Sequence, residues 1–404
     1  MKNFLLFFTL FVLGISLSAQ DKLKMIFVGD IMGHGPQIES AAIEPNKLYD
    51  YSPCFQFIKP LLEQADLAIG NLELTLPGKP PYTGYPTFKS PDELPLALRA
   101  AGFDLLVTAN NHSNDGGLIG VQNTIKTLEK NGFYQTGTFI DSSHRAALYP
   151  LIVYKGNFKL AFLNYTYGTN GIPNHKPSVV NLIDEKAIKA DIDAAKAHKP
   201  DAIITVVHWG DEYQLAENER QRALAQKMLN WGSTMVIGAH PHVVQPIKNY
   251  PLQDTNGATR NGLVVYSMGN FISAQTKTYT DIGLMVEIEL EKNNVGQQSA
   301  IGNQPPAVSN EQPVVSNPQT VISKVGYIPV YRYIFRPAAG KPVYMTVPVA
   351  AFENGEMQAQ QPMPEATRAA MKQSADVIRK NLTQHGAIER KVSAKEIITI
   401  PAEK

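Results

Sequence analysis

The sequence has a single cysteine, no excess of charge of either sign and, after its first twenty residues, no apolar run long enough to span a membrane. Cys54 alone cannot form an intrachain disulfide, so stability must come from a buried core or a bound metal. Lys and Arg number 37 against 36 Asp and Glu, a formal charge of +1, which is not the basic footprint of a nucleic-acid binder. We therefore expect no nucleic acid among the partners.

The first residues have the pattern of an export signal. Lys2 precedes an apolar run from Phe4 to about Leu17, and small residues cluster around Ser18 and Ala19. The run is shorter than the roughly 20 residues of a membrane span, which favours cleavage near Ala19 over a retained N-terminal anchor. The sequence thus predicts a signal peptide over residues 1–19 and an exported protein, in the periplasm or at the cell surface.

The rest of the chain indicates an α/β domain over residues 22–335. Its 44% hydrophobic and 18% charged residues are typical of a globular protein with a sizeable core. Short apolar runs alternate with segments of helical period, which predicts strand–helix–strand units and a largely parallel sheet. The runs are Lys24–Val28, Asp66–Ile69, Asp104–Ala109, Ala202–Val207 and Thr234–Ile237. The expected helices are Phe55–Gln64, Asp92–Ala101, Leu118–Lys130, Asp184–His198 and Glu217–Trp231.

Antiparallel strands are expected as well. A hairpin is predicted where Leu148–Tyr154 and Phe158–Thr166 flank Gly156-Asn157, which makes the sheet a doubled sandwich. Further strands are expected at Ile282–Leu290 and Val321–Phe335, separated by residues 292–319, whose Asn, Gln, Pro and Ser bias predicts a flexible insertion. Residues 336–404 are predicted to be a C-terminal extension, with a strand at Val343–Val347 and a helix at Pro364–Asn381 packing on the domain.

Each of the five apolar runs ends in side chains that suit a metal site or proton transfer. The ends are Gly29-Asp30, Gly70-Asn71-Leu72-Glu73, Asn110-Asn111-His112 with Asp115, His208-Trp209-Gly210-Asp211-Glu212 and Gly238-Ala239-His240-Pro241-His242. Because ligands of open α/β sheets bind outside the carboxyl ends of the strands, we expect these residues to converge. Imidazole, carboxylate and amide groups without thiolate favour Mn²⁺, Fe or Zn²⁺. The strand ends offer seven candidate ligand groups, more than one tetrahedral ion needs. Two ions bridged by a carboxylate would use them fully.

Taken singly, these residues have ordinary structural interpretations. Asp30 alone is typical of a turn or helix cap, and His112 alone could be a buried histidine with satisfied hydrogen bonds. Glu212 could orient His208, contact a substrate, or be a surface residue ahead of a helix. Asn270 could donate into a pocket or form a turn. The five strand ends taken together favour the functional interpretation.

These motifs, together with Ser267-Met268-Gly269-Asn270-Phe271, resemble the CapA-type poly-γ-glutamate capsule biosynthesis proteins, a branch of the calcineurin-like metallophosphoesterase superfamily. The resemblance runs in order from about Leu23 to Val330. It implies a four-layer αββα sandwich. It also implies a role in making or exporting an anionic envelope polymer such as poly-γ-glutamate, with membrane synthase subunits as partners.

The resemblance further implies a role for each site residue. Its metal ligands would be Asp30 and His242 for a first ion and Asn111, His208 and His240 for a second, with Glu73 as the bridge. His112 would be the general acid or transition-state stabiliser. Beyond what the resemblance implies, we expect Asp115 and Glu212 to be further catalytic residues and Asn71 and Asn270 to contact the substrate.

Two departures from the superfamily pattern affect this ligand set. Met32 stands where the superfamily has a histidine, and Asn71 stands where it has the bridging aspartate. His34 is an alternative source of the missing imidazole, and a mononuclear site stays open. Three functions therefore remain: a CapA-like protein with a metal-dependent hydrolase-like site, a periplasmic metal-dependent phosphoesterase, and a non-catalytic polymer-binding or assembly subunit.

Overall fold

The computed structural model describes residues 21–253, 259–293 and 319–398. The predicted signal peptide at 1–19 and nearly all of the predicted insertion at 292–319 lie outside the described residues. Within the part of the chain that is described, no helix combines the length and the apolar character needed to cross a membrane.

The first sheet contains nine strands among the described residues, in the order β18-β17-β16-β1-β4-β5-β6, with β15 beside β1 and β19 beside β17. Strands β1, β4, β5 and β6 run parallel, and β16, β17 and β18 add an antiparallel half next to β1. The strands are β1 Lys22–Ile31, β4 Leu67–Leu72, β5 Leu105–Val107, β6 Tyr134–Thr136, β15 Asn270–Ile272, β16 Ile282–Asn293, β17 Gln319–Phe335, β18 Val343–Pro348 and β19 Ile388–Glu389.

The second sheet has the order β13-β14-β12-β11-β9-β8. Its four central strands are parallel, and the edge strands β8 and β13 are antiparallel to their neighbours. The strands are β8 Leu151–Lys155, β9 Phe158–Thr166, β11 Ala202–His208, β12 Met235–Ala239, β13 Ile247–Gln253 and β14 Thr259–Val265. Two short ribbons, β2 Ala42–Glu44 with β3 Leu48–Tyr49 and β7 Thr138–Phe139 with β10 Val179–Val180, complete the strands.

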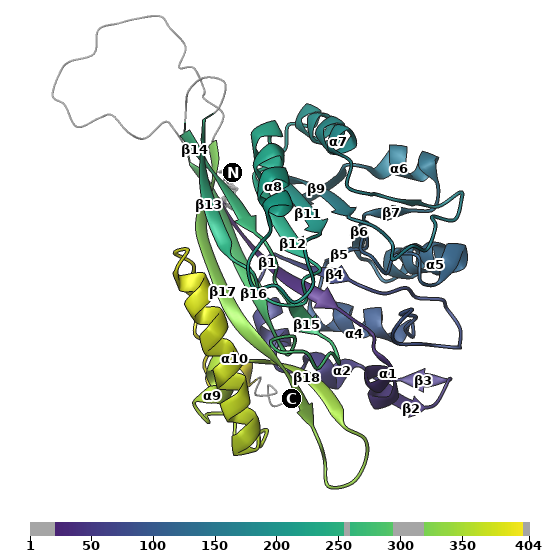
Figure 1. Cartoon of the computed structure of the whole chain (residues 1–404), viewed down its shortest axis with the longest axis vertical. Coiled ribbons are helices and arrows are strands. Elements are labelled where there is room, and N and C mark those ends of the chain that lie inside the picture. Colours follow the sequence, from purple (N-terminus) through teal and green to yellow (C-terminus); the bar gives the residue numbers. More distant parts are fainter. Residues whose placement is uncertain (1–20, 254–258, 294–318, 399–404) are drawn as a thin grey trace, which may run out of the picture.

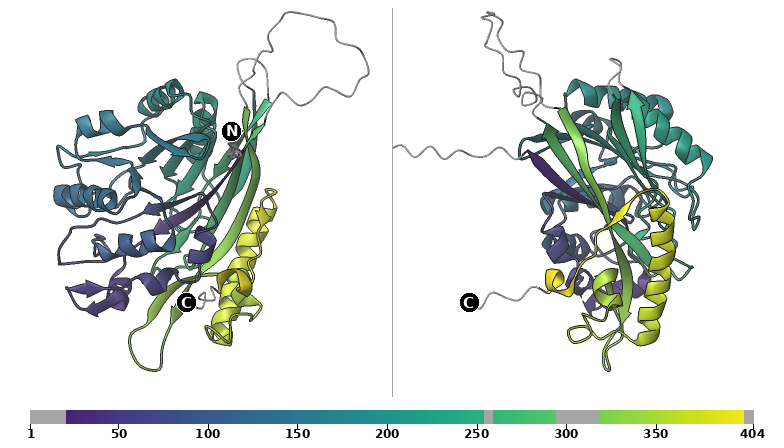
Figure 2. Two further views of the ribbon diagram at one scale, coloured as in Figure 1. Left: turned by 180° about the vertical axis from the view of Figure 1, so that it is seen from behind. Right: turned by 90° about the vertical axis from the view of Figure 1, so that its left-hand side faces the viewer.

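The alternation of side chains along the strands defines the layers. In β11, Ile204 and Val206 belong to one apolar core with the residues of the first sheet, so they face that sheet. Ile203 and Val207 point the other way and pack with the helices α7 (Glu185–Ala197) and α8 (Glu219–Trp231). On the far side of the first sheet, α10 (Glu365–Thr383) packs on β16 (Figures 1 and 2). The predicted four-layer αββα sandwich is confirmed.

Most of the expected helices are present. These are α4 (Glu93–Ala101), α5 (Gly117–Lys130), α7, α8 and α10, within a few residues of their predicted ends. The expected helix at Phe55–Gln64 is wrong: the chain forms two short helices, α2 (Ser52–Phe55) and α3 (Lys59–Leu62). Pro53 and Pro60 lie in the first turns of these helices, where a missing N–H needs no partner, and Pro60 could not continue a helix from α2. The remaining helices are α1 (Gly35–Ala41), α6 (Ser142–Leu148), α9 (Val349–Glu353) and α11 (Ala394–Ile397).

The residues after Phe335 pack on the first sheet. Strand β18 pairs with β17. After it, an ion-pair cluster joins α10 to α9 and to β19. Arg379 of α10 donates hydrogen bonds of 2.7 to 2.9 Å to Glu353 of α9 and to Glu389 of β19. The three side chains are only 12 to 18% exposed. The predicted boundary at residue 335, between the domain over 22–335 and the C-terminal extension over 336–404, stays a prediction.

We expect Arg379→Met to lower the free energy of unfolding by about 2–3 kcal/mol, because it leaves two mostly buried carboxylates without their cation. Urea denaturation of both proteins would measure the change. Lys380→Met is the matched control, since Lys380 is the next residue of the same helix and is exposed. A loss no larger than that of the control would contradict the prediction.

Candidate metal centre

The carboxyl ends of strands from both sheets meet at one place. In the first sheet, Asp30 at the end of β1 lies in register with Asn71 of β4 and Asn270 of β15. In the second sheet, His208 at the end of β11 lies in register with Ala239 of β12. Contacts join the two sets: His242 Nδ1 lies 3.2 Å from Asp30 Oδ2, and His208 Nε2 lies 3.6 Å from Glu73 Oε1. The convergence expected from the strand ends is present.

Two motif glycines allow this convergence. A Cβ on Gly29 would lie 1.8 Å from the carbonyl oxygen of Gly269, and one on Gly238 would lie 2.0 Å from that of Tyr266. Both strands therefore pack against the same segment, residues 266–269, just before they present Asp30 and the two histidines. The backbone N–H of Asp30 donates to Gly269 over 3.0 Å. Any side chain at either glycine would push the two sheets apart at the centre.

Among the described residues, three groups of side chains have the geometry to hold a cation. Within each group, one ligand atom per residue lies within 4.8 Å of the others. The groups are Glu73–His208–His240, Asp30–Glu73–His242 and Glu212–His240–His242. All of these residues are buried except Glu212, which is exposed. Glu73 belongs to both fully buried groups, which is the position that a bridging carboxylate would occupy.

The buried groups fit a divalent cation. Both carboxylate oxygens of Glu73 and Nδ1 of His240 are buried without a hydrogen-bond partner. Burial raises the pKa of Glu73 well above its usual range, and the neighbouring charge of Asp30 raises it further. A buried carboxylate without a partner is costly, and a coordinated cation would remove that cost. The donor set of imidazole nitrogens and carboxylate oxygens is one that first-row divalent ions accept.

Two histidines of the centre, His208 and His240, are held neutral. Burial and, to a smaller extent, the neighbouring histidines lower the pKa of His208 well below its usual range and that of His240 to about 3. A neutral imidazole keeps the lone pair that a metal requires. His240 and His242 have φ angles of 102° and 59°, a left-handed conformation on both sides of Pro241. Such strain is found where the surrounding structure fixes a functional side chain.

Amide side chains surround the ligands. Nδ2 of Asn71 donates to Asp30 Oδ1 over 2.7 Å and lies 3.2 Å from His208 Nδ1, so its N–H groups face the centre. Asn111 Oδ1 lies 2.8 Å from His208 Nε2, and Asn270 Oδ1 lies 3.0 Å from His242 Nδ1. Asn71 and Asn270 therefore contact candidate ligands directly, and their assignment to substrate binding stays a prediction. Met32 is buried in the apolar core.

His112 and Asp115 form a dyad beside the ligands. His112 Nδ1 lies 2.6 Å from Asp115 Oδ2, and the two side chains are 6% and 1% exposed. The same carboxylate oxygen accepts the backbone N–H of Phe88 over 2.5 Å, and the Phe88 ring lies 4.5 Å from the His112 ring. Asp115 can thus hold the proton on Nδ1 and leave Nε2 to act on a substrate.

His34, the alternative imidazole, belongs to none of the three groups found among the described residues. Its Nδ1 accepts the backbone N–H of Ala274 over 3.3 Å, and its ring lies 4.8 Å from the Phe88 ring. Burial lowers the pKa of His34 to about 4. Because Glu73 belongs to two of the groups and His34 to none, Glu73 is the better candidate to replace the missing ligands.

The sequence analysis missed Tyr167. Its ring lies 4.5 Å from that of His240, and its hydroxyl donates to Asn170 Oδ1 over 3.3 Å. Strand β9 is parallel to β11, with Thr166 in register with His208, so Tyr167 follows the same sheet edge. The sequence predicts β9 only as half of a hairpin, and a hairpin strand gives no reason to expect a site residue at its end. A cavity of about 680 Å³ next to the centre is lined by Tyr167, Trp209 and the start of α8.

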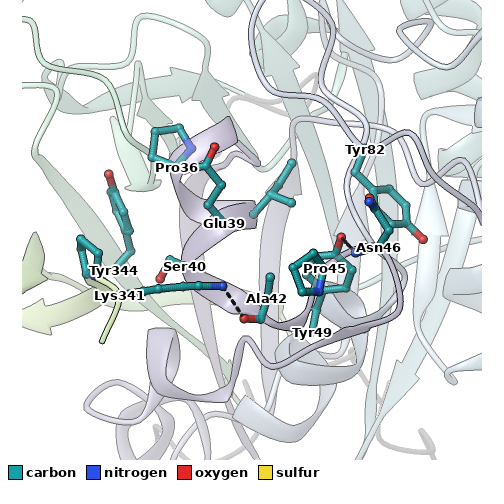
Figure 3. A pocket seen from close by; sticks show the side chains of 12 residues that line it. Pro36, Glu39, Ser40, Ala42, Pro45, Asn46, Tyr49, Tyr82, Lys341 and Tyr344 are labelled. Carbon is teal, nitrogen blue, oxygen red and sulfur yellow. Dashed lines mark hydrogen bonds between the residues drawn. The ribbon is translucent and has the colours of Figure 1, made fainter. Parts of the chain in front are cut away.

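Another cavity, of about 440 Å³, lies apart from the centre. Figure 3 shows Tyr49, Tyr82 and Tyr344 around it, with Lys341 donating to the carbonyl of Ala42 over 2.8 Å. It is formed by α1, the β2–β3 ribbon and the turn before β18. None of the predicted site residues lines this cavity.

Comparisons with known proteins agree with the order of the motifs. Residues 24–275 match the family model described as bacterial capsule synthesis protein PGA_cap. The PGA biosynthesis protein CapA of Bacillus subtilis (strain 168) is 29% identical over 291 residues, which cover 69% of this chain and 70% of that protein. The capsule biosynthesis protein CapA of Bacillus anthracis is 29% identical over 288 residues, which cover 68% of this chain and 65% of that protein.

Among solved structures, the chain is similar to the NAD nucleotidase NadN of Haemophilus influenzae at 12% identity and a TM-score of 0.44, over 93% of this chain and 65% of that one. It is also similar to the calcineurin-like phosphoesterase YfkN of Bacillus subtilis, at 14% identity and a TM-score of 0.42, over 89% of this chain and 98% of that one.

Proposed function

The chain belongs to the bacterial capsule synthesis protein PGA_cap family, and from this premise we propose that it is an exported protein of capsule or related envelope polymer biosynthesis that acts through a metal-dependent, hydrolase-like centre. The observation that carries the metal-dependent part is the pair of buried ligand groups that share Glu73. The buried oxygens of Glu73 support it, because they have no hydrogen-bond partner among the described residues.

The names of the relatives suggest a capsule polymer as the substrate or binding partner of this protein. One relative is a PGA biosynthesis protein and another a capsule biosynthesis protein. We therefore propose an anionic polymer such as poly-γ-glutamate as the molecule handled and membrane synthase subunits as partners. The predicted signal peptide at 1–19 would place the protein outside the cytoplasmic membrane, where such a polymer is exported.

The residues would divide the chemistry between them. A divalent Mn, Fe or Zn ion would supply Lewis-acid activation of the scissile group and of the attacking water. Glu73, Asp30 and the histidines His208, His240 and His242 would hold one or two ions, with Asn111 as a further ligand of the second ion. Asn71 would orient Asp30 through its hydrogen bond. His112, fixed by Asp115, would give a proton to the leaving group.

The first test is metal analysis of the protein purified without chelator, followed by incubation with poly-γ-glutamate and with a panel of phosphomonoesters and phosphodiesters in Mn²⁺. We expect one or two equivalents of a transition metal and shortening of the polymer, seen by size-exclusion chromatography. In cells, Asp30→Ala and His240→Ala are expected to reduce the amount of surface polymer.

The other outcomes separate the alternatives. Turnover of phosphoesters without any effect on the polymer would identify a phosphoesterase instead. Unchanged surface polymer in both variants, in a protein that binds no metal, would overturn the metal-dependent mechanism and leave a binding or assembly subunit.

A further inference from the structure

We propose that Glu212 is a solvent-facing metal ligand, which completes the centre in place of the imidazole that is absent at Met32. This inference rests on the proposed function, because it takes the buried groups to be a cation site. It assigns Glu212 to the metal itself, whereas the sequence predicts a catalytic, orienting or substrate-contacting residue.

The centre is short of one ligand. Asp30, Glu73 and His242 form one buried group, and Met32, at the position where the superfamily has a histidine, is packed in the apolar core. Asn71 contributes no carboxylate, and the N–H groups of its amide face Asp30 and His208. A transition-metal ion accepts four or more donors, so a group of three leaves room for another oxygen or nitrogen.

Glu212 is in place to supply that donor. One of its carboxylate oxygens lies within 4.8 Å of a ring nitrogen of His240 and of one of His242. Each histidine also belongs to one of the two buried groups, so Glu212 stands next to both candidate ion positions. Its charge also acts on Glu73, whose pKa is raised partly by the Glu212 carboxylate.

The backbone fixes this position although the side chain is exposed. The segment 209–213 is joined to the segment of the two histidines by two hydrogen bonds, from Trp209 N–H to Ala239 over 3.0 Å and from Tyr213 N–H to Pro241 over 2.8 Å. Gly210 and Tyr213 have positive φ angles, 92° and 66°, which turn the chain on either side of Glu212. Glycine suits position 210 because side chains rarely adopt its φ of 92°, and a Cβ would also lie 2.7 Å from the Gln221 side chain. Positive φ angles and two backbone hydrogen bonds thus hold the turn that carries Glu212, and backbone strain of this kind clusters at functional sites.

Asp211 provides a control for charge. It neighbours Glu212, is exposed, and acts electrostatically on His240, but it belongs to none of the three groups. Its carboxylate instead accepts from Asn218 Nδ2 over 2.8 Å, at the start of α8. Asp211→Asn therefore removes a negative charge close to the same histidines without removing a ligand atom.

The experiment compares Mn²⁺ binding to the full-length wild type, Glu212→Gln and Asp211→Asn by isothermal titration calorimetry, with the electron paramagnetic resonance spectrum of bound Mn²⁺ as a second readout. We expect Glu212→Gln to weaken Mn²⁺ binding by at least about 10-fold, since even residues that only orient ligands are worth 10–100-fold, and to change the spectrum. Asp211→Asn is expected to shift affinity by less than about 3-fold and to keep the spectrum.

Equal affinity of Glu212→Gln and wild type would overturn the inference and leave the proposed function standing. An equal loss in both variants would also overturn it, because charge alone would then explain the effect. A wild type that binds no Mn²⁺, Zn²⁺ or Fe²⁺ would instead remove the metal-dependent function on which the inference rests. Glu212 is exposed and the change to Gln is isosteric, so thermal unfolding of the metal-free variant should match that of the wild type.

Discussion

Glu73→Gln is expected to lower the affinity of the protein for Mn²⁺ by at least about 100-fold, more than the loss typical of residues that merely orient ligands. The reason is geometric: Glu73 is the single residue shared by both fully buried ligand groups, so one substitution removes a donor from each. Glutamine has the same size and keeps the packing, but its neutral amide provides a weaker donor. Calorimetric titration of the chelator-treated proteins would measure the difference.

The same substitution should separate metal binding from folding. At a free metal concentration of 100 Kd, the wild type should gain about 2.7 kcal/mol of stability, and the variant almost none. Without metal, the variant should be at least as stable as the wild type, because Glu73 is a fully buried carboxylate without a hydrogen-bond partner. This pattern is that of a residue retained for function at the expense of stability.

Tyr51→Phe is a matched control for this comparison. The Tyr51 hydroxyl is also buried without a partner, but it lies among Tyr49, Cys54 and Tyr82, away from the metal groups. Removing it takes away the same kind of unsatisfied atom, and the variant should keep the full metal response. Metal stabilisation that persists in Glu73→Gln, or disappears in Tyr51→Phe, would exclude the bridging role.

The strand ends could be predicted from the sequence because they depend only on local sequence patterns and on the general topology of parallel sheets. Apolar runs predict the parallel strands, and the topology of such sheets brings their carboxyl ends together. Five candidate ligands lie at or just after the end of such a run, namely Asp30, Glu73, His208, His240 and His242. Their convergence could therefore be predicted without knowing the loop conformations. The same rule would have included Tyr167, had β9 been recognised as parallel to β11.

What the sequence could not give depends on contacts between distant segments. The break in the helix expected at Phe55–Gln64 is an exception, because Pro60 lies inside the apolar period and marks the break locally. The sequence predicts a catalytic, orienting or substrate-contacting role for Glu212 but not its approach to His240 and His242, because that turn depends on hydrogen bonds with residues 239 and 241. The sequence shows that Asn71 stands where a carboxylate is expected. Only the side-chain geometry shows that its amide N–H faces Asp30.

The metal-free protein is expected to lose stability steeply as the pH falls below about 6.5. His34, His208 and His240 all have pKa values depressed by burial, to about 4 for His34, to about 3 for His240 and well below the usual range for His208. In the unfolded chain each binds a proton near pH 6.5, while in the folded protein each stays neutral. Acid therefore favours the unfolded chain, and the loss continues until the folded pKa values are reached.

Glu73 acts in the opposite direction. Its pKa is raised in the folded protein, so the folded protein takes up a proton at a higher pH than the unfolded chain does. Its contribution to stability is present below the unfolded value near 4.5 and is lost as the pH rises through the folded value. One proton bound by Glu73 offsets one of the three histidine protons over the range that the two effects share.

The net expectation is a loss of about 2–3 kcal/mol in the free energy of unfolding between pH 6 and pH 5, because each unbalanced proton is worth about 1.4 kcal/mol per pH unit. Urea denaturation in EDTA at several pH values would measure it. Glu73→Gln should steepen the slope by removing the opposing proton, and His34→Gln should make it shallower, whereas replacement of the exposed His175 should leave it unchanged. A stability that is flat between pH 6 and pH 5 would mean that the histidines are charged in the folded protein, and hence that the centre is not the preformed set of neutral ligands that its burial indicates.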